Sequence, residues 1–366
     1  MDAILLACNI GQPAVSWKKC SYKGVVFPMK LVTYSPAGAD TRSPGRAGIL
    51  YGDATILDLE TLLGWAERNA TSLPSLPRPG TMLQLLRQER EGMAAARAAL
   101  ATAEQARLED LAEEPGLLHP LADVSLQAPI PDAPSFRDFY TFEQHVKAAR
   151  ARRGAQMIPE WYKIAVFYFS NTSELYGPLE PVPYPHLSHE VDFELEMAAV
   201  VGRAGRDISA DEAPDYIAGY MVLNDWSARD LWRQEQVLNM GPAKGKDFAT
   251  SIGPCLVTPE ELEDRRIGSG RDERFDLAML GRINGDQLSQ DNARNMYYTF
   301  PQMLERASQH VRLRPGDIIG SGTCGTGCIL ELGTERHRWL MPGDVVEMEI
   351  ERLGTLSNTL VGSKEQ

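Results

Sequence analysis

Three acidic residues stand at the ends of apolar segments in the middle of the chain. Glu194 and Glu196 lie in DFELEMAAVVG, and Asp225 follows the apolar run 220–223 in NDWSARD. Side chains two residues apart in a strand point to the same face, so the two glutamates should project together. Carboxylates on a buried face repel each other and resist desolvation unless a cation lies between them. The pattern predicts a site for a hard divalent cation. A strand whose glutamates face solvent is the alternative, and Asp225 favours the cation site.

Five segments of the chain occur in the order, and near the spacing, of one enzyme family. They are FRDFYTFEQH (136–145), DFELEMAAVVG (192–202), NDWSARD (224–230), GKDFATSIGP (245–254) and SGTCGTGCILELG (321–333). Together they resemble the fumarylacetoacetate hydrolase family over about residues 135–350. The resemblance implies a mixed, predominantly β fold. Its parts would be a mixed β-sandwich roll as catalytic domain, a small N-terminal α+β domain and a homodimeric assembly.

The resemblance also implies roles for single residues in these segments. His145 is expected to be the catalytic base, with Glu331 holding its ring. A carboxylate that binds one ring nitrogen fixes the tautomer and raises the basicity of the other nitrogen. Lys246 is expected to stabilise an oxyanion or a carbanionic leaving group. The implied metal ligands are Asp138, Glu194, Glu196 and Asp225.

A further group of residues is expected to contact the substrate. Tyr140 and Tyr168 align with substrate tyrosines of the family, although Tyr168 fits a core position equally well. Arg229 fits either a salt bridge to a neighbouring acid or a substrate carboxylate. Trp232 stands where fumarylacetoacetate hydrolases proper carry glutamine, and this difference indicates another substrate, bulkier or aromatic. The complete set is Tyr140, Tyr168, Arg229, Trp232, Thr250 and Thr323.

These residues predict a metal-dependent hydrolase that cleaves a carbon–carbon bond in a β-diketo acid, either an acylpyruvate or a fumarylacetoacetate-like compound. The alternative is an isomerase or decarboxylase of a 2-hydroxymuconate-like diacid in aromatic catabolism. A non-catalytic metal-binding scaffold is a third reading. The presence of both His145 and Glu331 favours hydrolysis. Mg²⁺ is the expected cation, and Ca²⁺ or Mn²⁺ would accept the same oxygen ligands.

Composition indicates the cellular compartment and excludes some classes of binding partner. A net charge of −13 and a pI near 5.1 argue against a nucleic-acid-binding or anionic-membrane surface. The resemblance implies a small-molecule diketo acid as the partner. Five cysteines without framework spacing indicate a reducing, cytoplasmic compartment. We interpret Cys324 and Cys328 as small residues of a glycine-rich turn, since one C-x₃-C pair is weak evidence for zinc.

The chain is expected to divide into three parts. Residues 1–28 are predicted to be a disordered or mis-annotated extension, with a transit peptide as the competing interpretation. Residues 29–130 are predicted to form the small N-terminal domain, and 131–366 the catalytic domain. Proline-rich segments at 72–80 and 115–134 are predicted linkers. Hairpin turns are predicted at 51–53 and 284–285. Helices are predicted at 57–67, 81–113, 211–219, 228–236 and 300–310.

Overall fold

A computed structural model describes residues 27–38, 44–70, 76–152 and 154–362. The predicted extension therefore lies almost entirely outside the described residues. Within them the chain is mostly β, as the sequence predicts. No helix in the described part of the chain has the length and hydrophobicity that crossing a bilayer requires.

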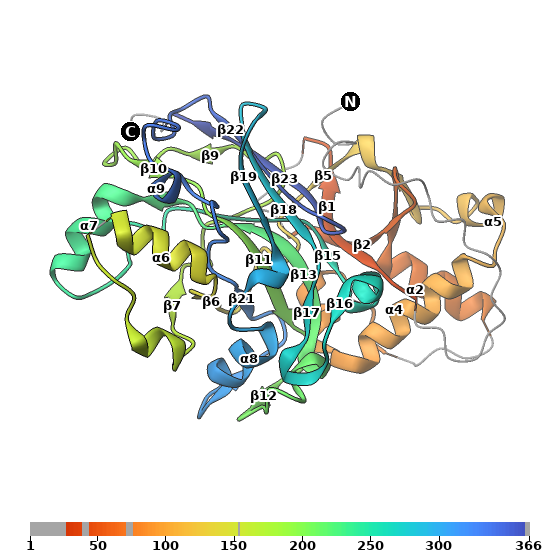
Figure 1. Cartoon of the computed structure of the whole chain (residues 1–366). Coiled ribbons are helices and arrows are strands. Elements are labelled where there is room, and N and C mark those ends of the chain that lie inside the picture. Colours follow the sequence, from red (N-terminus) through yellow and green to blue (C-terminus); the bar gives the residue numbers. More distant parts are fainter. Residues whose placement is uncertain (1–26, 39–43, 71–75, 153, 363–366) are drawn as a thin grey trace.

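One large mixed sheet runs through the molecule (Figure 1). Its central strands are buried along their whole length and read as nearly continuous apolar runs, the pattern of strands covered on both faces. The order is β4-β3-β2-β1-β15-β13-β11-β21-β6-β7, with β5 beside β1 and β8 beside β15. The central and catalytic-side strands are β6 (Phe136–Phe139), β7 (Phe167–Ser170), β8 (Leu175–Tyr176), β11 (Leu195–Val201), β13 (Ile217–Asn224), β15 (Thr250–Val257) and β21 (Ile318–Gly320).

The N-terminal strands extend this same sheet, because β1 pairs with β15. Gly52 has a positive φ in the predicted turn between β2 and β3, and these two strands pair there as a hairpin. The division into 29–130 and 131–366 thus crosses a continuous sheet, and it stays a proposal. The strands are β1 (Lys30–Pro36), β2 (Arg46–Tyr51), β3 (Thr55–Asp58), β4 (Leu118–Pro120) and β5 (Val124–Leu126).

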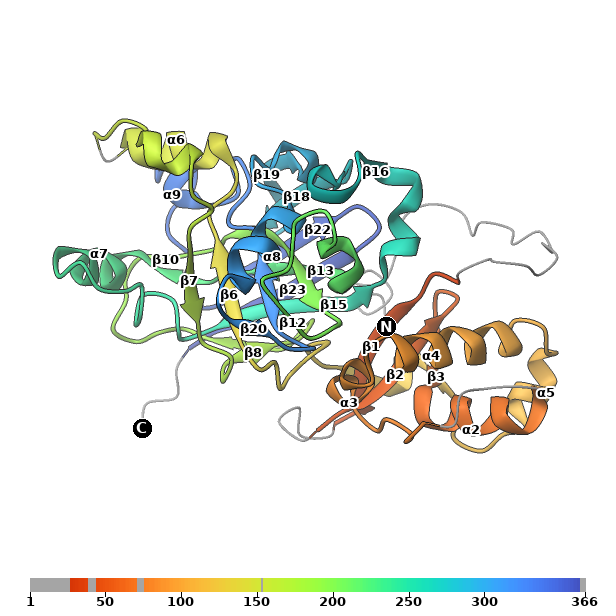
Figure 2. The ribbon, with the colours of Figure 1, turned by 90° about the horizontal axis from the view of Figure 1, so that it is seen from below.

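Helices of the N-terminal part gather on one side of the molecule, opposite α6 and α7 (Figure 2). The segment 81–113, predicted to be a helix or a helix pair, forms three helices. Gly92 permits close packing of two of them, because a Cβ there would lie 2.9 Å from the carbonyl oxygen of Leu85. The helices are α2 (Leu59–Asn69), α3 (Met82–Arg87), α4 (Glu89–Ala103) and α5 (Leu108–Ala112).

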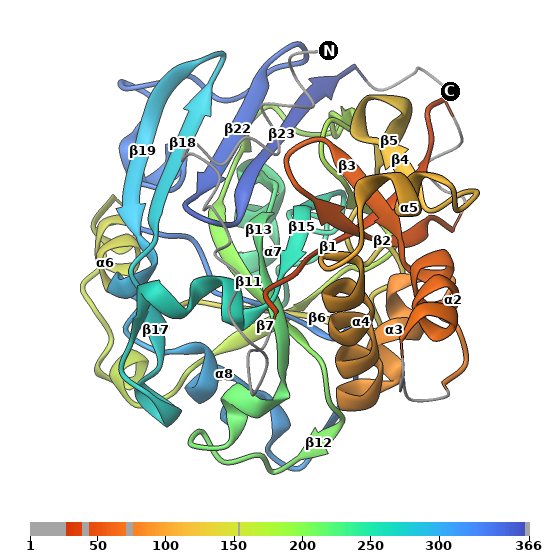
Figure 3. The same cartoon turned by 90° about the vertical axis from the view of Figure 1, so that its right-hand side faces the viewer.

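A second, five-stranded sheet packs against the large one and closes the core (Figure 3). Its strands alternate buried and half-buried residues, as expected when one face meets the core. Asn284 and Gly285 both have positive φ in the predicted β18–β19 hairpin turn. In order, the strands are β19 (Asp286–Asn292), β18 (Ala278–Ile283), β22 (Val345–Ile350), β23 (Gly354–Val361) and β9 (Val182–Pro183).

Shorter elements complete the fold. The remaining strands pair as β10 (Val191–Asp192) with β14 (Ser227–Ala228), β12 (Gly205–Arg206) with β20 (Arg312–Leu313), and β16 (Arg266–Ile267) with β17 (Arg274–Phe275). The helices are α6 (Glu143–Arg152), α7 (Arg229–Val237), α8 (Phe300–Ser308) and α9 (Ile329–Leu332). The 3₁₀ helices are η1 (Leu121–Asp123), η2 (Pro159–Tyr162), η3 (Ala213–Tyr216), η4 (Pro259–Arg265), η5 (Gly270–Asp272) and η6 (Ala293–Asn295).

Two local predictions were wrong. The predicted helix over 211–219 is only the 3₁₀ turn η3, because the apolar run from Ile217 pairs with β11 as a strand. The predicted linker over 115–134 contains β4 and β5. Pro120 is tolerated there because β4 is the edge strand of the large sheet. The helices predicted near 228–236 and 300–310 are confirmed as α7 and α8.

Asp58 joins the N-terminal strands to α2. Its carboxylate caps the helix through Thr61 N at 2.9 Å, accepts from Tyr34 Oη at 2.8 Å, and binds Arg46 Nε at 2.7 Å. Burial alone would raise the pKa of Asp58, but the bonds from Arg46 and Thr61 outweigh it and lower that pKa.

We expect Asp58→Asn to lower the free energy of unfolding by about 3 kcal/mol, because it weakens a cap and charged hydrogen bonds together. A lowered folded pKa gives stabilisation that is complete above the unfolded pKa of about 3.9 and is lost as pH falls below it. The difference between variant and wild type should therefore shrink in acid. Denaturant melts at several pH values measure this, with exposed Asp132→Asn as the control. A constant difference at every pH would contradict the assignment.

Candidate metal and catalytic site

Three buried carboxylates converge from neighbouring strands. Asp138 lies on β6, Glu196 on β11, and Asp225 directly after β13. Because β6, β21, β11 and β13 are adjacent in the sheet, their side chains meet although they are far apart in sequence. One oxygen from each carboxylate lies within 4.8 Å of the others. All three residues are at most 3% exposed.

The surroundings of this carboxylate trio (Asp138, Glu196 and Asp225) fit a divalent cation. Oδ1 of Asp225 is buried and has no hydrogen-bond partner among the described residues. A Cβ on Gly320 would lie 2.4 Å from Asp138 Oδ1, so only glycine leaves this space open. Burial, together with the charge of Asp225, raises the pKa of Asp138 well above its usual range. Burial and Asp138 do the same for Glu196. A bound cation would relieve this repulsion, and an all-oxygen donor set suits Mg²⁺, Ca²⁺ or Mn²⁺.

Glu194 lies beside the trio but has different partners. The sequence predicts four metal ligands, and the structure groups three of them in the trio and places Glu194 beside it. One of its oxygens accepts from Lys246 Nζ, and the other lies 2.8 Å from Arg229 Nη2. Burial alone would raise the pKa of Glu194, but Lys246 and Arg229 outweigh it and lower that pKa to about 2. Glu194 is thus an ionised carboxylate that already holds two cations.

Lys246 is buried at the centre of this charge network. Its ammonium group bridges Glu194 and Asp225, with Nζ 2.5 Å from Asp225 Oδ2. Burial alone would lower the pKa of Lys246, but the two carboxylates raise it above the usual value. The side chain is therefore a permanent cation next to the trio. A cation held there can stabilise negative charge that develops on a substrate.

His145 and Glu331 form the pair that the sequence predicts. His145 Nδ1 lies 2.8 Å from Glu331 Oε2, and both residues are at most 7% exposed. His145 comes from α6 and Glu331 from α9, and Arg152 joins these two helices through bonds to the carbonyl oxygens of Glu331 and Leu332. The bond to Glu331 occupies Nδ1 and leaves Nε2 of the ring as the atom that can accept a proton.

The structure places the residues that are expected to contact the substrate in different surroundings. Tyr168 donates to Asp225 Oδ2 at 2.5 Å, and Thr323 Oγ1 lies 3.4 Å from Glu196 Oε1, so both touch the trio. The ring of Tyr140 meets His145 edge-on at 5.7 Å between centroids. Thr250 is buried at the start of β15, where its backbone pairs with β8. Its hydroxyl makes no hydrogen bond to the trio among the described residues.

Arg229 and Trp232 lie on α7. Arg229 makes ion pairs to Asp192 and Glu194, which is the salt-bridge alternative for this residue. Trp232 is half-buried one turn later, and its backbone packs against Gly245, where a Cβ would lie 2.8 Å from the Trp232 Cα. This close packing places Trp232 beside the segment that carries Lys246.

The sequence did not identify two residues of this region. Asp192 accepts from Arg229 Nε at 2.8 Å and from the backbone N–H groups that begin α9. The D-x-E-x-E spacing of Asp192, Glu194 and Glu196 was the available signal. We interpreted Cys328 as a small residue of a turn, but its Sγ lies 3.9 Å from His145 Nδ1, so the thiol contacts the predicted base.

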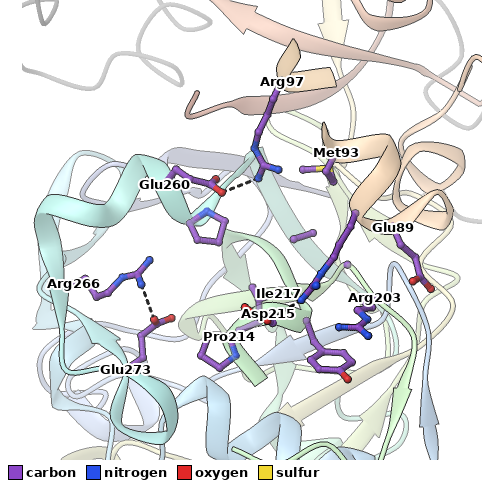
Figure 4. A pocket seen from close by; sticks show the side chains of 15 residues that line it. Glu89, Met93, Arg97, Arg203, Pro214, Asp215, Ile217, Glu260, Arg266 and Glu273 are labelled. Atoms are coloured by element: carbon purple, nitrogen blue, oxygen red, sulfur yellow. Dashed lines mark hydrogen bonds and ion pairs between the residues drawn. The ribbon is translucent and has the colours of Figure 1, made fainter. Parts of the chain in front are cut away.

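A separate cavity of about 500 Å³ lies between α4 and the catalytic part of the chain (Figure 4). Its charged side chains pair with each other, as in Arg97–Glu260 at 2.8 Å and Arg266–Glu273 at 3.1 Å. Neither the residues of the trio nor the His145–Glu331 pair line this cavity. We therefore place the chemistry at the buried carboxylates and His145.

Comparison with known proteins assigns the chain to a family. Residues 135–361 match the family described as fumarylacetoacetate (FAA) hydrolase, C-terminal. The chain belongs to the fumarylacetoacetate hydrolase family. The matched region contains the trio and the His145–Glu331 pair.

Relatives of this chain include both oxaloacetate tautomerases and a fumarylacetoacetase of Arabidopsis thaliana, which is 31% identical over 243 residues, covering 54% of this chain and 58% of the relative. The chain is 31% identical over 309 residues to the human mitochondrial oxaloacetate tautomerase FAHD2B, covering 83% of this chain and 87% of the relative. It is 32% identical over 200 residues to a mitochondrial oxaloacetate tautomerase of Xenopus laevis, covering 54% of this chain and 59% of the relative. Membership in the family therefore indicates an enzyme without deciding between hydrolysis and isomerisation.

Solved structures confirm the fold. Maleylpyruvate hydrolase from Sphingobium sp. SYK-6, in complex with manganese(II) and pyruvate, superposes with a TM-score of 0.63 at 24% identity. The superposition covers 92% of this chain and all of that one. In this chain the carboxylate trio itself fits a divalent cation, without specifying Mg²⁺.

Proposed function

We propose that this protein is a divalent-cation-dependent hydrolase that cleaves a carbon–carbon bond in a β-diketo acid. The observation that carries the proposal is the buried His145–Glu331 pair beside three convergent carboxylates and a buried lysine. The pair supplies a base, the carboxylates fit a cation, and the lysine supplies fixed positive charge. These are the groups that water activation and a carbanionic leaving group require.

A divalent cation held by Asp138, Glu196 and Asp225 would polarise the oxygens of the oxo acid as a Lewis acid. His145 Nε2 takes a proton from water, while Glu331 stabilises the imidazolium through Nδ1. The water oxygen bonds to the distal carbonyl carbon, and Lys246 stabilises developing negative charge. The electron pair of the broken carbon–carbon bond remains on the leaving carbon, which takes the proton back from His145.

A tautomerase or isomerase is the second candidate. The oxaloacetate tautomerase relatives favour it, because one aligns over 83% of this chain. In this reaction His145 would take a proton from one carbon of the substrate and return it to the oxygen or to another carbon, without using water. A 2-hydroxymuconate-like diacid or oxaloacetate would be the substrate. Hydrolysis and tautomerisation thus share the same site residues and differ in the use of water.

An ultraviolet assay on a small substrate panel separates these reactions. The panel contains acylpyruvates, an acetoacetate-type diketo acid, oxaloacetate and a hydroxymuconate-type diacid, each with Mg²⁺ or Mn²⁺. We expect cleavage of a diketo acid, abolished by a chelator and in His145→Ala. Tautomerisation alone, with no cleavage of any diketo acid, would refute the hydrolase and support the second candidate.

Trp232 is proposed to shape the substrate wall, because it packs beside the Lys246 segment. We expect Trp232→Gln to change the ratio of kcat/KM between bulky and small acyl groups by about 10-fold, a value typical of pocket contacts. Cation affinity should not change. Phe169→Gln, on an exposed aromatic residue of β7, is the matched control. An unchanged substrate profile would exclude Trp232 from the substrate wall.

A further inference from the structure

A second cavity, the α8 cavity, lies between α8, η5 and the segment 163–165 that follows η2. Its volume of about 270 Å³ is just below the range typical of ligand pockets, so it suits a small ligand. The carboxylate trio and the His145–Glu331 pair do not line it. Its charged and amide-bearing lining residues are Lys163, Arg271, Gln302, Glu305, Arg306 and Gln309.

The charges that line the α8 cavity are mostly positive. Lys163, Arg271 and Arg306 are exposed, and none of them has an ion-pair partner among the described residues. The one acid of the lining, Glu305, already accepts from Ala210 N at 3.1 Å. Three cations and one acid give the lining a net charge of +2, in a chain whose net charge is −13. Like charges held together repel each other, and a bound anion would relieve that repulsion.

The two glutamines of the α8 cavity add further hydrogen-bond donors. Gln302 Oε1 accepts from Thr299 N at 3.1 Å, as part of the capping box of α8. Gln309 Oε1 accepts from Arg306 Nη1 at 2.8 Å. Because each amide oxygen is already engaged, the NH₂ group is what each side chain can offer to a ligand. The free polar groups of the cavity are therefore mainly donors, as an anion requires.

Hydrogen bonds fix the backbone that carries these donors. The carbonyl oxygen of Arg271 accepts from Thr299 Oγ1 at 2.6 Å, and the N–H group of Arg271 donates to Asp211 Oδ1 at 3.1 Å. Gln302 and Arg306 lie one turn apart on α8, so they share one face of this helix. Donors thus converge on the cavity from three separate segments of the chain.

One wall of the α8 cavity is joined to the surroundings of His145. Tyr298 lines the cavity and donates its hydroxyl to the carbonyl oxygen of Trp161 at 2.8 Å. Trp161 Nε1 in turn donates to the carbonyl oxygen of Tyr140 at 2.8 Å, and the Tyr140 ring meets that of His145. Trp161 lies in η2, just before Lys163. An anion that ties Lys163 to α8 would therefore brace the segment that supports Tyr140.

We propose that the α8 cavity binds the phosphate group of a small phosphate monoester and that binding braces residues 159–165 against α8. A phosphate monoester carries about −1.5 to −2 charges at pH 7, which matches the net charge of +2 on the lining. Tetrahedral phosphate oxygens accept from several directions, as donors from three segments require, whereas a planar carboxylate suits a single guanidinium fork. Binding there does not depend on the reaction at the trio.

Calorimetric titration of the full chain with glycerol 3-phosphate tests the binding. The protein is first freed of divalent cations, so that the trio cannot hold the probe through a metal. We expect binding at one site in wild type, and binding at least about 10-fold weaker in Arg271→Gln and in Arg306→Gln. Arg87→Gln is the matched control, because it removes the same charge from an exposed arginine outside the cavity, and it should keep wild-type affinity. Thermal melts verify the folding of each variant.

Two further probes separate phosphate from charge alone. Succinate carries a charge of about −2 without a phosphate group, and it should bind at least about 10-fold more weakly than glycerol 3-phosphate. Inorganic phosphate should compete with glycerol 3-phosphate, and glycerol should not. Equal affinity for succinate, lost in Arg271→Gln, would overturn the assignment to phosphate. No binding by wild type, or affinity unchanged in both cavity variants, would overturn the site.

Amide hydrogen exchange gives the second readout, because it reports on local opening of a segment. Glycerol 3-phosphate should slow exchange in residues 159–165 of wild type and leave it unchanged in Arg271→Gln. Exchange in α2, which lies in the N-terminal part of the chain, should not change in either protein. Binding of the probe without slower exchange in residues 159–165 would overturn the bracing of this segment.

Discussion

Glu196→Gln is expected to abolish cation binding and turnover together. Gln keeps the side-chain volume but removes one of three negative ligands, so affinity for Mg²⁺ or Mn²⁺ should fall by more than the about 100-fold typical of supporting residues. Wild type should gain about 2.7 kcal/mol of stability at a cation concentration 100 times Kd, and the variant should gain none. Calorimetric titration and melts with and without cation measure both effects.

Without a cation, Glu196→Gln should be at least as stable as wild type at high pH. The raised pKa of Glu196 means that its ionised form is unfavourable in the fold. A folded pKa above the unfolded one makes the metal-free wild type lose stability as pH rises above about 4.3. Glu196→Gln removes this loss, so the metal-free variant should equal or exceed wild type at pH 8. Glu273→Gln, which replaces a buried acid remote from the trio, is the control. A variant that still gains stability from cation would contradict the ligand role.

His145→Ala is expected to retain cation binding and to lose about 10²–10⁴-fold in kcat, the usual contribution of a general base. The side chain lies beside the trio and is not one of its members, so the cation-dependent rise in melting temperature should persist. Steady-state kinetics and melts with Mn²⁺ measure the two quantities. Added imidazole should restore part of the activity by entering the vacated space.

His310→Asn provides the matched control, because His310 is exposed and asparagine tolerates its positive φ. Its kcat should equal that of wild type. Turnover by His145→Ala within a few-fold of wild type would remove His145 from the mechanism. Loss of cation binding in the same variant would instead make it a ligand.

The sequence predicted that acidic side chains lie close together, but it did not predict which partners each of them binds. The E-x-E spacing indicated two neighbouring buried carboxylates, and the structure places Glu196 on β11 and Glu194 directly before it. The spacing could not show that Glu194 is held by Lys246 and Arg229, because these partners come from segments more than 30 residues away. The His145–Glu331 pair was inferred from a family resemblance. Its 186-residue separation leaves no local signal.

Local patterns identified elements wherever tertiary pairing agreed with them. The hairpin turns at Gly52 and Gly285 and the helices α7 and α8 were predicted because glycine turns and apolar periodicity are local features. The strand after Ile217 was missed because pairing with β11 overrides the helical pattern before it. The pairing of β1 with β15 could not be predicted either, since this strand order depends on contacts between residues more than 200 positions apart.

Deuterium exchange into pyruvate tests the central claim most directly, because both candidate reactions require the same base to move a proton at the carbon beside an oxo group. Pyruvate in D₂O is followed by proton NMR with enzyme and Mg²⁺ or Mn²⁺. We predict loss of the methyl signal with wild type, and no loss above background with chelator, with Glu196→Gln or with His145→Ala. No exchange by cation-loaded wild type, or exchange unaffected by chelator, would contradict a cation-assisted His145 base.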